Sequence, residues 1–305
     1  MKLKRMLLFT AILLALCGAA RAEGGLKVTA TDFPCYDFAR QVMGGIGEVT
    51  MLIHPGTEVH SYDPSPADIL SIGQSDLFVY IGGEGDAWVD GILSGFDSDG
   101  APATLRMMDA VEPLEEEEEG EHGHGDHDGP EYDEHIWTSP KNAKRMVRSL
   151  ADRLAEVDPE NADAYRANAD AYIAQIDEID AAFEAVVTGG ARREVVFADR
   201  FPFLYFVRDY GLDYVAAFPS CTAETEPTPQ ILMKLIRRVA DDGIPVIYTI
   251  EMSTQAVAKA VAEETGARIL TMHSAQTVTR EEFDAGETYV SLMWKNVDAL
   301  REGLN

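Results

Sequence analysis

The sequence predicts an α/β fold in which two lobes with parallel sheets are bridged by a long rigid helix. Short strand patterns alternate with helical patterns in both halves of the chain, an order typical of parallel sheets. An unbroken helical pattern separates the halves. At 1.5 Å per residue it would extend roughly 42 Å, more than one small lobe requires. About 280 residues follow a predicted leader, more than a single hydrophobic core usually contains.

Residues 1–22 have the pattern of a secretory signal peptide. Basic residues precede an apolar run at 6–16, and a small-x-small cleavage pattern stands at 20–22. The apolar run is too short to be a comfortable membrane span. We therefore expect the mature chain outside the cytoplasmic membrane, in the periplasm or at the cell surface. Cys17 stands in a half-matching lipobox, so a lipid anchor is the alternative to a soluble form.

The first lobe is predicted at 26–156, where strand patterns precede helical ones. Strands are predicted at 26–30, 48–53 and 76–81, with an edge strand at 107–111, and helices at 36–43, 66–74, 87–93 and 139–155. Ligands of such parallel sheets bind at the carboxyl ends of the strands.

The bridging helix is predicted within 157–188. Asp158 is a suitable N-cap, and Pro159 suits the first helical position. The apolar positions of this segment form one stripe of an amphipathic helix: Tyr165, Tyr172, Ile176, Ile179, Phe183 and Val186. Two glycines, Gly189 and Gly190, end it.

The second lobe is predicted at 189–305 and repeats the alternation of the first. Strands are predicted at 194–198, 214–218, 246–250 and 268–272, and helices at 203–210, 228–241, 253–265 and 289–302. The two halves therefore look alike in architecture.

The charge balance excludes one class of partner. The formal net charge is −28, and removal of the basic leader makes it more negative. Such a chain will not bind nucleic acid through its surface, because phosphate contacts need Lys and Arg. It attracts cations instead. Beyond the leader, the sequence contains no stretch long and apolar enough to cross a membrane.

Two cysteines, Cys35 and Cys221, remain in the predicted mature chain. Outside the cytoplasm they could form a disulfide. Two free or buried thiols are the alternative, since the sequence does not give the distance between their Cα atoms.

Residues 115–134 form an acidic loop that also carries histidines. His122, His124 and His127 lie among glutamates, aspartates and glycines. Imidazole with carboxylate suits zinc and similar divalent ions. The glycines favour a loose backbone, so we expect an accessory metal-collecting loop rather than a rigid site. A solvated acidic loop without metal is the alternative.

Three histidines outside that tract lie where ligands of an α/β protein are expected. His60 follows a predicted strand, His135 lies in a loop of the first half, and His273 directly follows the strand at 268–272. A cleft between two lobes would bring the carboxyl ends of their strands together. We therefore expect these three imidazoles to meet there.

The segments PGTEVHSYDPSPADI and DEHIWTSPKNA, which contain His60 and His135, together with FLYFVRDYGL and the His-rich tract, carry a family resemblance. From residue 26 to the end, the chain resembles the metal-binding subunits of bacterial zinc and manganese ABC importers, the zinc-uptake periplasmic solute-binding proteins. The resemblance implies two α/β lobes bridged by a long helix, with the metal in the cleft.

Two departures from the family pattern affect the ligand set. Arg200 stands where the family usually has a third ligand, and arginine cannot bind a cation. His273 stands where the resemblance implies an acidic ligand. The predicted set is thus His60, His135 and His273. Zinc is commonly four-coordinate, so a water or a carboxylate must complete it. The candidates are Asp199, Glu224 and Glu226, and the first two are also the predicted partners of Arg200.

Three imidazoles favour Zn²⁺ over Mn²⁺, which prefers oxygen ligands. The resemblance thus implies a protein that captures Zn²⁺ and delivers it to an ABC transporter permease and its ATPase. It would be a monomer that meets the membrane only by docking or through a lipid anchor. A manganese-binding protein of the same kind, a metal-dependent adhesin and a zinc buffer are the alternatives. An enzyme with a three-histidine zinc site is not expected, because HExxH, GxSxG and P-loop motifs are absent.

Overall fold

A computed structural model describes residues 25–97, 100–116, 131–218 and 228–305 of the chain. Several sequence predictions concern residues outside these ranges: the signal peptide at 1–22 with Cys17, the tract histidines His122, His124 and His127, and also Cys221, Glu224 and Glu226. The fold below is that of the described residues.

The first lobe contains a parallel four-stranded sheet in the order β2-β1-β3-β4. Its strands are β1 (Lys27–Ala30), β2 (Glu48–Met51), β3 (Leu77–Tyr80) and β4 (Ala103–Arg106), and its helices are α2 (Phe33–Met43), α3 (Pro66–Gly73) and α4 (Trp88–Leu93). Two of these helices have polar N-caps. The Asp32 carboxylate accepts the Cys35 N–H at the start of α2, and Ser65 forms a capping box with Asp68 at the start of α3. The strands predicted at 26–30, 48–53 and 76–81 are confirmed.

The predicted edge strand at 107–111 is wrong. The last strand of this sheet is β4, and a 3₁₀ turn, η2 (Met107–Ala110), follows it. The register explains the difference. Arg106 pairs with Tyr80 at the end of β3, so residues beyond Arg106 have passed the sheet edge. The Met108 N–H still donates to the Ile81 carbonyl at 3.0 Å, so the 3₁₀ turn stays attached to the segment that follows β3.

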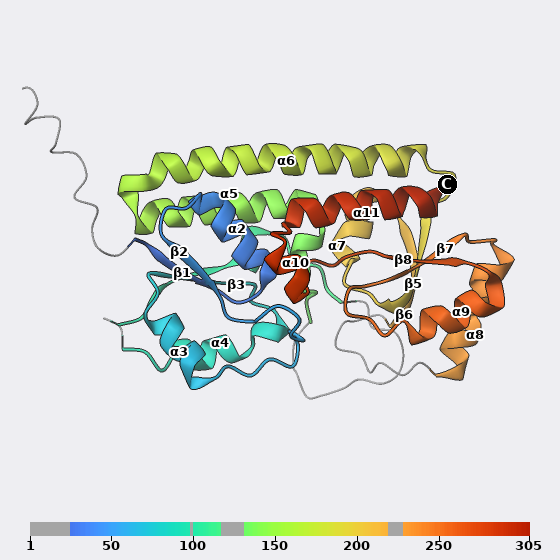
Figure 1. Cartoon of the computed structure of the whole chain (residues 1–305), viewed down its shortest axis with the longest axis horizontal. Coiled ribbons are helices and arrows are strands. Elements are labelled where there is room, and N and C mark those ends of the chain that lie inside the picture. The colour runs from blue at the N-terminus through green and yellow to red at the C-terminus, as the bar shows by residue number, and fades with distance from the viewer. Residues whose placement is uncertain (1–24, 98–99, 117–130, 219–227) are drawn as a thin grey trace, which may run out of the picture.

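Two long helices follow a short 3₁₀ turn, η3 (Ile136–Thr138). They are α5 (Pro140–Val157) and α6 (Ala162–Gly189). Helix α6 begins slightly later than predicted, because Pro159–Asn161 forms a separate 3₁₀ turn, η4. The predicted apolar stripe of α6 is buried along its whole length. Figure 1 shows α6 lying across both lobes.

The second lobe repeats the topology of the first, with a parallel sheet in the order β6-β5-β7-β8. Its strands are β5 (Glu194–Arg200), β6 (Asp213–Phe218), β7 (Val246–Thr249) and β8 (Arg268–Thr271), and its helices are α7 (Leu204–Tyr210), α8 (Pro229–Asp241), α9 (Ala256–Thr265), α10 (Arg280–Asp284) and α11 (Tyr289–Leu304). The short helix α10, which begins with a Thr279–Glu282 capping box, was not predicted. In Figure 1, α8 and α9 cover one face of this sheet, and α6 and α11 lie on the other side.

One hydrophobic core connects the two lobes. It includes Val28 from the first sheet, Phe197 from the second and Phe183 from α6. Helix α11 also reaches back to the first lobe, where the Tyr289 N–H donates to the Asp37 carboxylate at 2.8 Å. The lobes are therefore joined by buried packing as well as by chain connections. Two smaller hydrophobic clusters lie in the lobes, one including residues of α8 and α9 and the other residues of α3 and α4.

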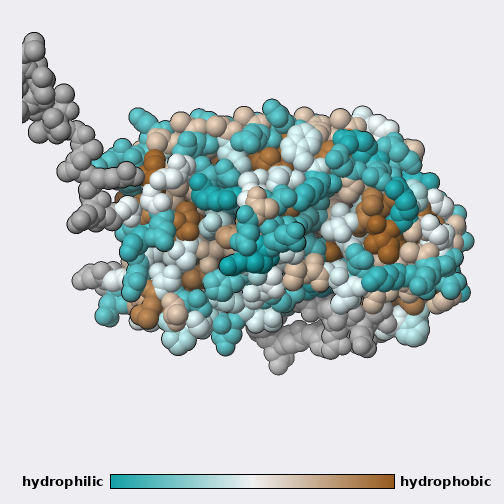
Figure 2. All heavy atoms as spheres, viewed as in Figure 1, coloured by the Kyte–Doolittle hydropathy of each residue, from teal (hydrophilic) through white to brown (hydrophobic). Residues whose placement is uncertain are grey.

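Three further features of the fold concern its surface, its described cysteine and the character of its helices. Figure 2 shows a mainly hydrophilic face interrupted by small hydrophobic areas. Cys35 is a free thiol that lies fully buried in the core. None of the helices in the described part of the chain is long and apolar enough to cross a membrane.

Candidate metal centre

Two of the predicted histidines meet at one edge of the first lobe. His60 lies in the loop after β2, and His135 lies immediately before η3. Their ring centroids are 5.6 Å apart. Together with Glu134, they each offer a ligand atom such that the three atoms lie within 4.8 Å of one another. The fold thus brings two distant loops to a common point, as expected for the carboxyl edge of a parallel sheet.

Each of these imidazoles faces a carboxylate through its Nδ1 atom. Asp133 Oδ1 lies 3.0 Å from His135 Nδ1, and Glu134 Oε1 lies 3.3 Å from His60 Nδ1. Donation of the Nδ1 proton to a carboxylate fixes the tautomer that has its lone pair on Nε2. Histidines that bind metals are commonly oriented in this way. Both rings are therefore prepared to bind an ion through Nε2.

Glu134 is buried and firmly held. Its Oε2 atom accepts the Gly85 N–H at 2.8 Å. Gly83 must lack a side chain, because a Cβ atom there would come within 2.1 Å of the Glu134 Cβ. Burial opposes ionisation of this carboxyl, but the hydrogen bond to His60 and the charge of His135 outweigh it and hold the pKa of Glu134 below its ordinary value.

Two further buried carboxyls, those of Asp32 and Asp86, interact electrostatically with Glu134. Burial raises the pKa of Asp32 to about 8, and the charge of Asp86 adds to the effect. Burial likewise raises the pKa of Asp86 to about 7, against the hydrogen bond from the Gly82 N–H. A cation bound at this edge of the sheet would favour the ionised form of both carboxyls, since an opposite charge nearby lowers a carboxyl pKa.

The second lobe reaches the site through Gln276. Its Nε2 atom lies 3.2 Å from His60 Nε2. With the His60 proton on Nδ1, the amide donates to the Nε2 lone pair, which is the position that a metal would take. Rotation of the amide by half a turn would replace that N–H with the carbonyl oxygen, a ligand that divalent ions accept. Gln276 was not among the predicted site residues.

The loop that carries Gln276 is held rigidly. Asn296 bonds both the N–H and the carbonyl of His273, each at 2.7 Å. The Glu251 carboxylate accepts the Ser274 N–H at 2.7 Å, and the Trp137 indole donates to the Ser274 carbonyl at 2.8 Å. The last of these bonds joins the loop to the first lobe, so the position of the Gln276 backbone is fixed from both sides.

His273 is buried beside the site, but it does not belong to the three-residue group found among the described residues. Its Nδ1 atom accepts the Ala275 N–H at 2.9 Å, and its Nε2 atom lies 4.0 Å from Glu282 Oε1. A neutral ring whose Nδ1 accepts a hydrogen bond carries its proton on Nε2. In this arrangement neither nitrogen offers a lone pair to an ion.

Asp199 and Arg200 lie at the end of β5. The Asp199 carboxylate accepts the backbone N–H groups of Arg200 at 2.9 Å and of Ile250 at 3.4 Å. The guanidinium of Arg200 lies 3.2 Å from Glu58 Oε2, in the loop that leads to His60. Arg200 thus makes an ion pair across the lobes with a residue that the sequence did not suggest.

The structure adds three residues to the predicted site: Asp133, Glu134 and Gln276. The two acids could have been found in the sequence, because they directly precede His135 and a histidine that binds metal commonly has a carboxylate partner. Gln276 carries no such signal. A glutamine three residues after a histidine is ordinary, and only the packing of the two lobes places it against His60.

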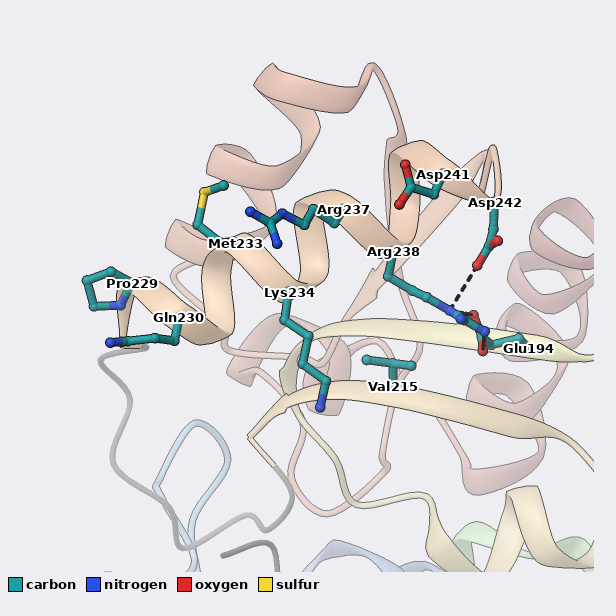
Figure 3. A pocket seen from close by; sticks show the side chains of 10 residues that line it. All are labelled: Glu194, Val215, Pro229, Gln230, Met233, Lys234, Arg237, Arg238, Asp241 and Asp242. Atoms are coloured by element: carbon teal, nitrogen blue, oxygen red, sulfur yellow. Dashed lines mark hydrogen bonds and ion pairs between the residues drawn. The ribbon is translucent and has the colours of Figure 1, made fainter.

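Another hollow lies in the second lobe, between α8 and the edge of its sheet (Figure 3). Arg238 crosses it, with its Nε atom 2.9 Å from both Glu194 Oε1 and Asp242 Oδ2. Met233 and Lys234 line it on the helix. It contains none of the site residues described above and no histidine or cysteine, and two of its three carboxylates, those of Glu194 and Asp242, already face Arg238.

Comparison with known proteins gives consistent matches over almost the whole chain. The family model described as zinc-uptake complex component A, periplasmic, matches residues 28–303. Zinc-binding lipoprotein AdcA of Streptococcus pneumoniae (strain ATCC BAA-255 / R6) is 32% identical over 292 residues, which cover 95% of this chain and 58% of that protein. The chain thus spans less than two thirds of the length of this relative.

Two further matches cover both partners more fully. The high-affinity zinc uptake system protein ZnuA of Bacillus subtilis (strain 168) is 30% identical over 302 residues, which cover 96% of this chain and 94% of that protein. The crystal structure of the Zn(II)-bound ZnuA-like domain of Streptococcus pneumoniae AdcA superimposes with a TM-score of 0.77 at 30% identity, over 92% of this chain and 99% of that one. The two-lobed fold predicted from the sequence is confirmed by these neighbours.

Proposed function

The chain belongs to the family of zinc-uptake complex component A, periplasmic, and on this premise we propose that it binds Zn²⁺ between its lobes and delivers the ion to an ABC transporter permease and its ATPase. The ion is cargo, and nothing chemical happens to it. The family is one of uptake components rather than of enzymes. The leader-like segment at 1–22 supports export of the chain, with or without an anchor on Cys17.

The observation that carries this proposal is the pair of oriented imidazoles. Asp133 Oδ1 and Glu134 Oε1 face the Nδ1 atoms of His135 and His60, which favours the tautomers that offer Nε2 to an ion. Imidazole nitrogen favours zinc over the alkaline-earth ions and over manganese. Of these four side chains, Asp133, Glu134 and His135 are almost fully buried, which limits their motion before the ion arrives.

The remaining ligands come from the second lobe in this proposal. Gln276 would turn its amide oxygen toward the ion when zinc takes the His60 lone pair. His273, the ligand expected from the sequence, would need to give up the Ala275 N–H before it could bind. Asp199 is engaged by backbone N–H groups, and Glu224 lies outside the described residues. A water can fill the fourth position.

Calorimetric titration of the metal-free protein with Zn²⁺ tests the proposal. One tight site is expected in the wild type, and His60→Ala and His135→Ala should each weaken it by at least about 10- to 100-fold, since each removes a ligand. His54→Ala is the matched control, because His54 is exposed and lies six residues from His60 in the same loop. Tight binding that survives both ligand substitutions would reject this site.

A further inference from the structure

The segment 56–60, which leads to His60, contacts the second lobe through Glu58 and His60 and approaches it at Gly56. A Cβ atom at Gly56 would lie 4.0 Å from the Met252 methyl group. The Glu58 carboxylate lies 3.2 Å from the Arg200 guanidinium, and His60 Nε2 lies 3.2 Å from Gln276 Nε2. Two side-chain contacts and this close approach place the segment against the second lobe.

Both ends of this loop are attached to the first lobe instead. Before it, the Ile53 N–H donates to the Thr31 carbonyl at 2.9 Å. After it, the Tyr62 ring packs edge-on against Trp88 with centroids 5.8 Å apart. The loop therefore spans the boundary between the lobes only in its middle, where it carries one of the two oriented histidines.

The lobes themselves have little freedom to separate. They share one buried core, and α6 and α11 cross from one to the other. In contrast, the contact between Arg200 and Glu58 lies near the surface: the side chain of Arg200 is 18% exposed and that of Glu58 is 47% exposed. Release of an ion from His60 therefore requires less disruption if the loop moves than if the lobes part.

We propose that Arg200 is a positioning residue whose ion pair with Glu58 holds the 56–60 loop against the second lobe, and so sets the rate at which zinc leaves. This inference rests on the proposed function. Arg200 does not bind the ion in this account. It acts through Glu58 on the placement of His60, from the position where the family resemblance implies a ligand.

The expected size of the effect is modest. A partly exposed ion pair contributes little, so its loss should speed zinc release by about two- to fivefold. Salt at about 1 M shortens the Debye length to roughly 3 Å and should remove most of the difference. A ligand, by comparison, would change binding far more and would not lose its effect in salt.

The test is a double-substitution cycle with Glu58→Gln and Arg200→Gln. Zinc-loaded protein is mixed rapidly with excess chelator, and the rate of zinc release is followed at low and at high salt. Glu58→Gln should speed release about two- to fivefold when Arg200 is present. It should have no effect in the Arg200→Gln background, because its partner is already gone. Circular dichroism checks that each variant is folded.

The pair Arg268–Glu302, 2.6 Å apart in the second lobe, supplies the control. Arg268→Gln and Glu302→Gln should leave the release rate unchanged. An equal effect of Glu58→Gln in both backgrounds would show that Glu58 acts by its charge alone, and would overturn the proposal. So would an unchanged rate, or an effect that persists in high salt. A wild-type protein that takes up no zinc would reject the proposed function itself.

Discussion

Asp133 and Glu134 are neighbours in the chain, yet each orients a different histidine. Asp133 faces His135, two residues along, whereas Glu134 faces His60, which arrives from a separate loop. Successive side chains of an extended segment point in opposite directions, which explains how adjacent acids can serve two partners. The short sequence Asp-Glu-His thus contains the ligand candidate His135 and the carboxylates that orient His135 and His60, of which Glu134 also offers a ligand atom.

Gln276 and His273 compete for the same role at the second-lobe side of the site, and substitution separates them. Because Gln276 touches His60, whereas His273 Nδ1 accepts the Ala275 N–H, Gln276→Ala should weaken zinc binding more than His273→Asn does. Gln276→Glu should tighten it by about 10-fold or more, since a carboxylate adds charge to the bond. Competition against a fluorescent chelator measures all three. A His273→Asn variant that binds worst would restore His273 as the ligand.

Asp86 gives the protein a testable dependence of stability on pH. Its pKa is raised by burial to about 7 in the fold, so the folded state holds a proton that the unfolded state loses above about pH 4. The contribution is therefore fully present below about pH 4 and disappears as the pH rises through about 7. Asp32 shifts in the same direction and is coupled to Asp86.

Asp86→Asn should accordingly stabilise the metal-free protein at pH values near 8 by on the order of 1–3 kcal/mol, with little gain near pH 5. Urea unfolding of the wild type and the variant at both pH values provides the free energies. A constant difference between the two proteins across this range would mean that Asp86 does not titrate with folding.

At the scale of elements, residues 114–116 and 131–133, at the two ends of the acidic tract, are hydrogen-bonded to each other beside the metal centre. We call this pair of segments the neck. The Glu116 N–H donates to the Glu131 carbonyl and the Asp133 N–H to the Leu114 carbonyl, both at 2.9 Å. Tyr205 of α7 donates its hydroxyl to the Asp133 carbonyl at 2.8 Å and accepts the Leu114 N–H at 3.0 Å. The residues next to His135 are therefore held by the fold, independently of the tract between the two sides of the neck.

Replacement of residues 117–130 by two glycines should consequently leave the tight zinc site intact. The short distance across the neck can be closed by such a turn, and the weaker sites predicted for His122, His124 and His127 should disappear with the tract. Calorimetry counts both kinds of site, and His60→Ala in the shortened chain identifies the tight one. Loss of tight binding on shortening would place an essential ligand in the tract.

At the scale of the whole molecule, the shared core predicts that the lobes unfold together. Phe183 on α6 is fully buried and packs edge-on against Phe206 of α7, with centroids 4.8 Å apart. Phe183→Ala should lower the free energy of unfolding by about 3–5 kcal/mol. The loss should affect both lobes, because α6 also packs against α2 and α5.

Unfolding of Phe183→Ala in urea, followed by tryptophan fluorescence and by far-ultraviolet circular dichroism, measures this. Trp88 reports on the first lobe, Trp137 on its contact with the second lobe and Trp294 on α11, while circular dichroism reports on all helices. Coincident transitions are expected. Two separate midpoints would mean that the lobes are independent folding units.

The sequence by itself determined the elements and most of their order. The apolar stripe from Tyr165 to Val186 was sufficient to predict α6, because a helix spaces its buried positions every three or four residues. Alternating strands and helices were sufficient for two parallel sheets. The predicted edge strand at 107–111 was wrong because the limits of that strand depend on its register with β3. Such a contact between distant segments is not encoded in local patterns.

The tertiary structure decided which polar groups meet. His60 and His135 were found in the sequence by residue type, but their orientation by Glu134 and Asp133 depends on loops from different parts of the sheet edge. The contacts of Gln276 with His60 and of Arg200 with Glu58 join residues far apart in sequence, through the packing of two lobes on one core. Pairings of this kind depend on three-dimensional distance, which periodicity and composition do not specify.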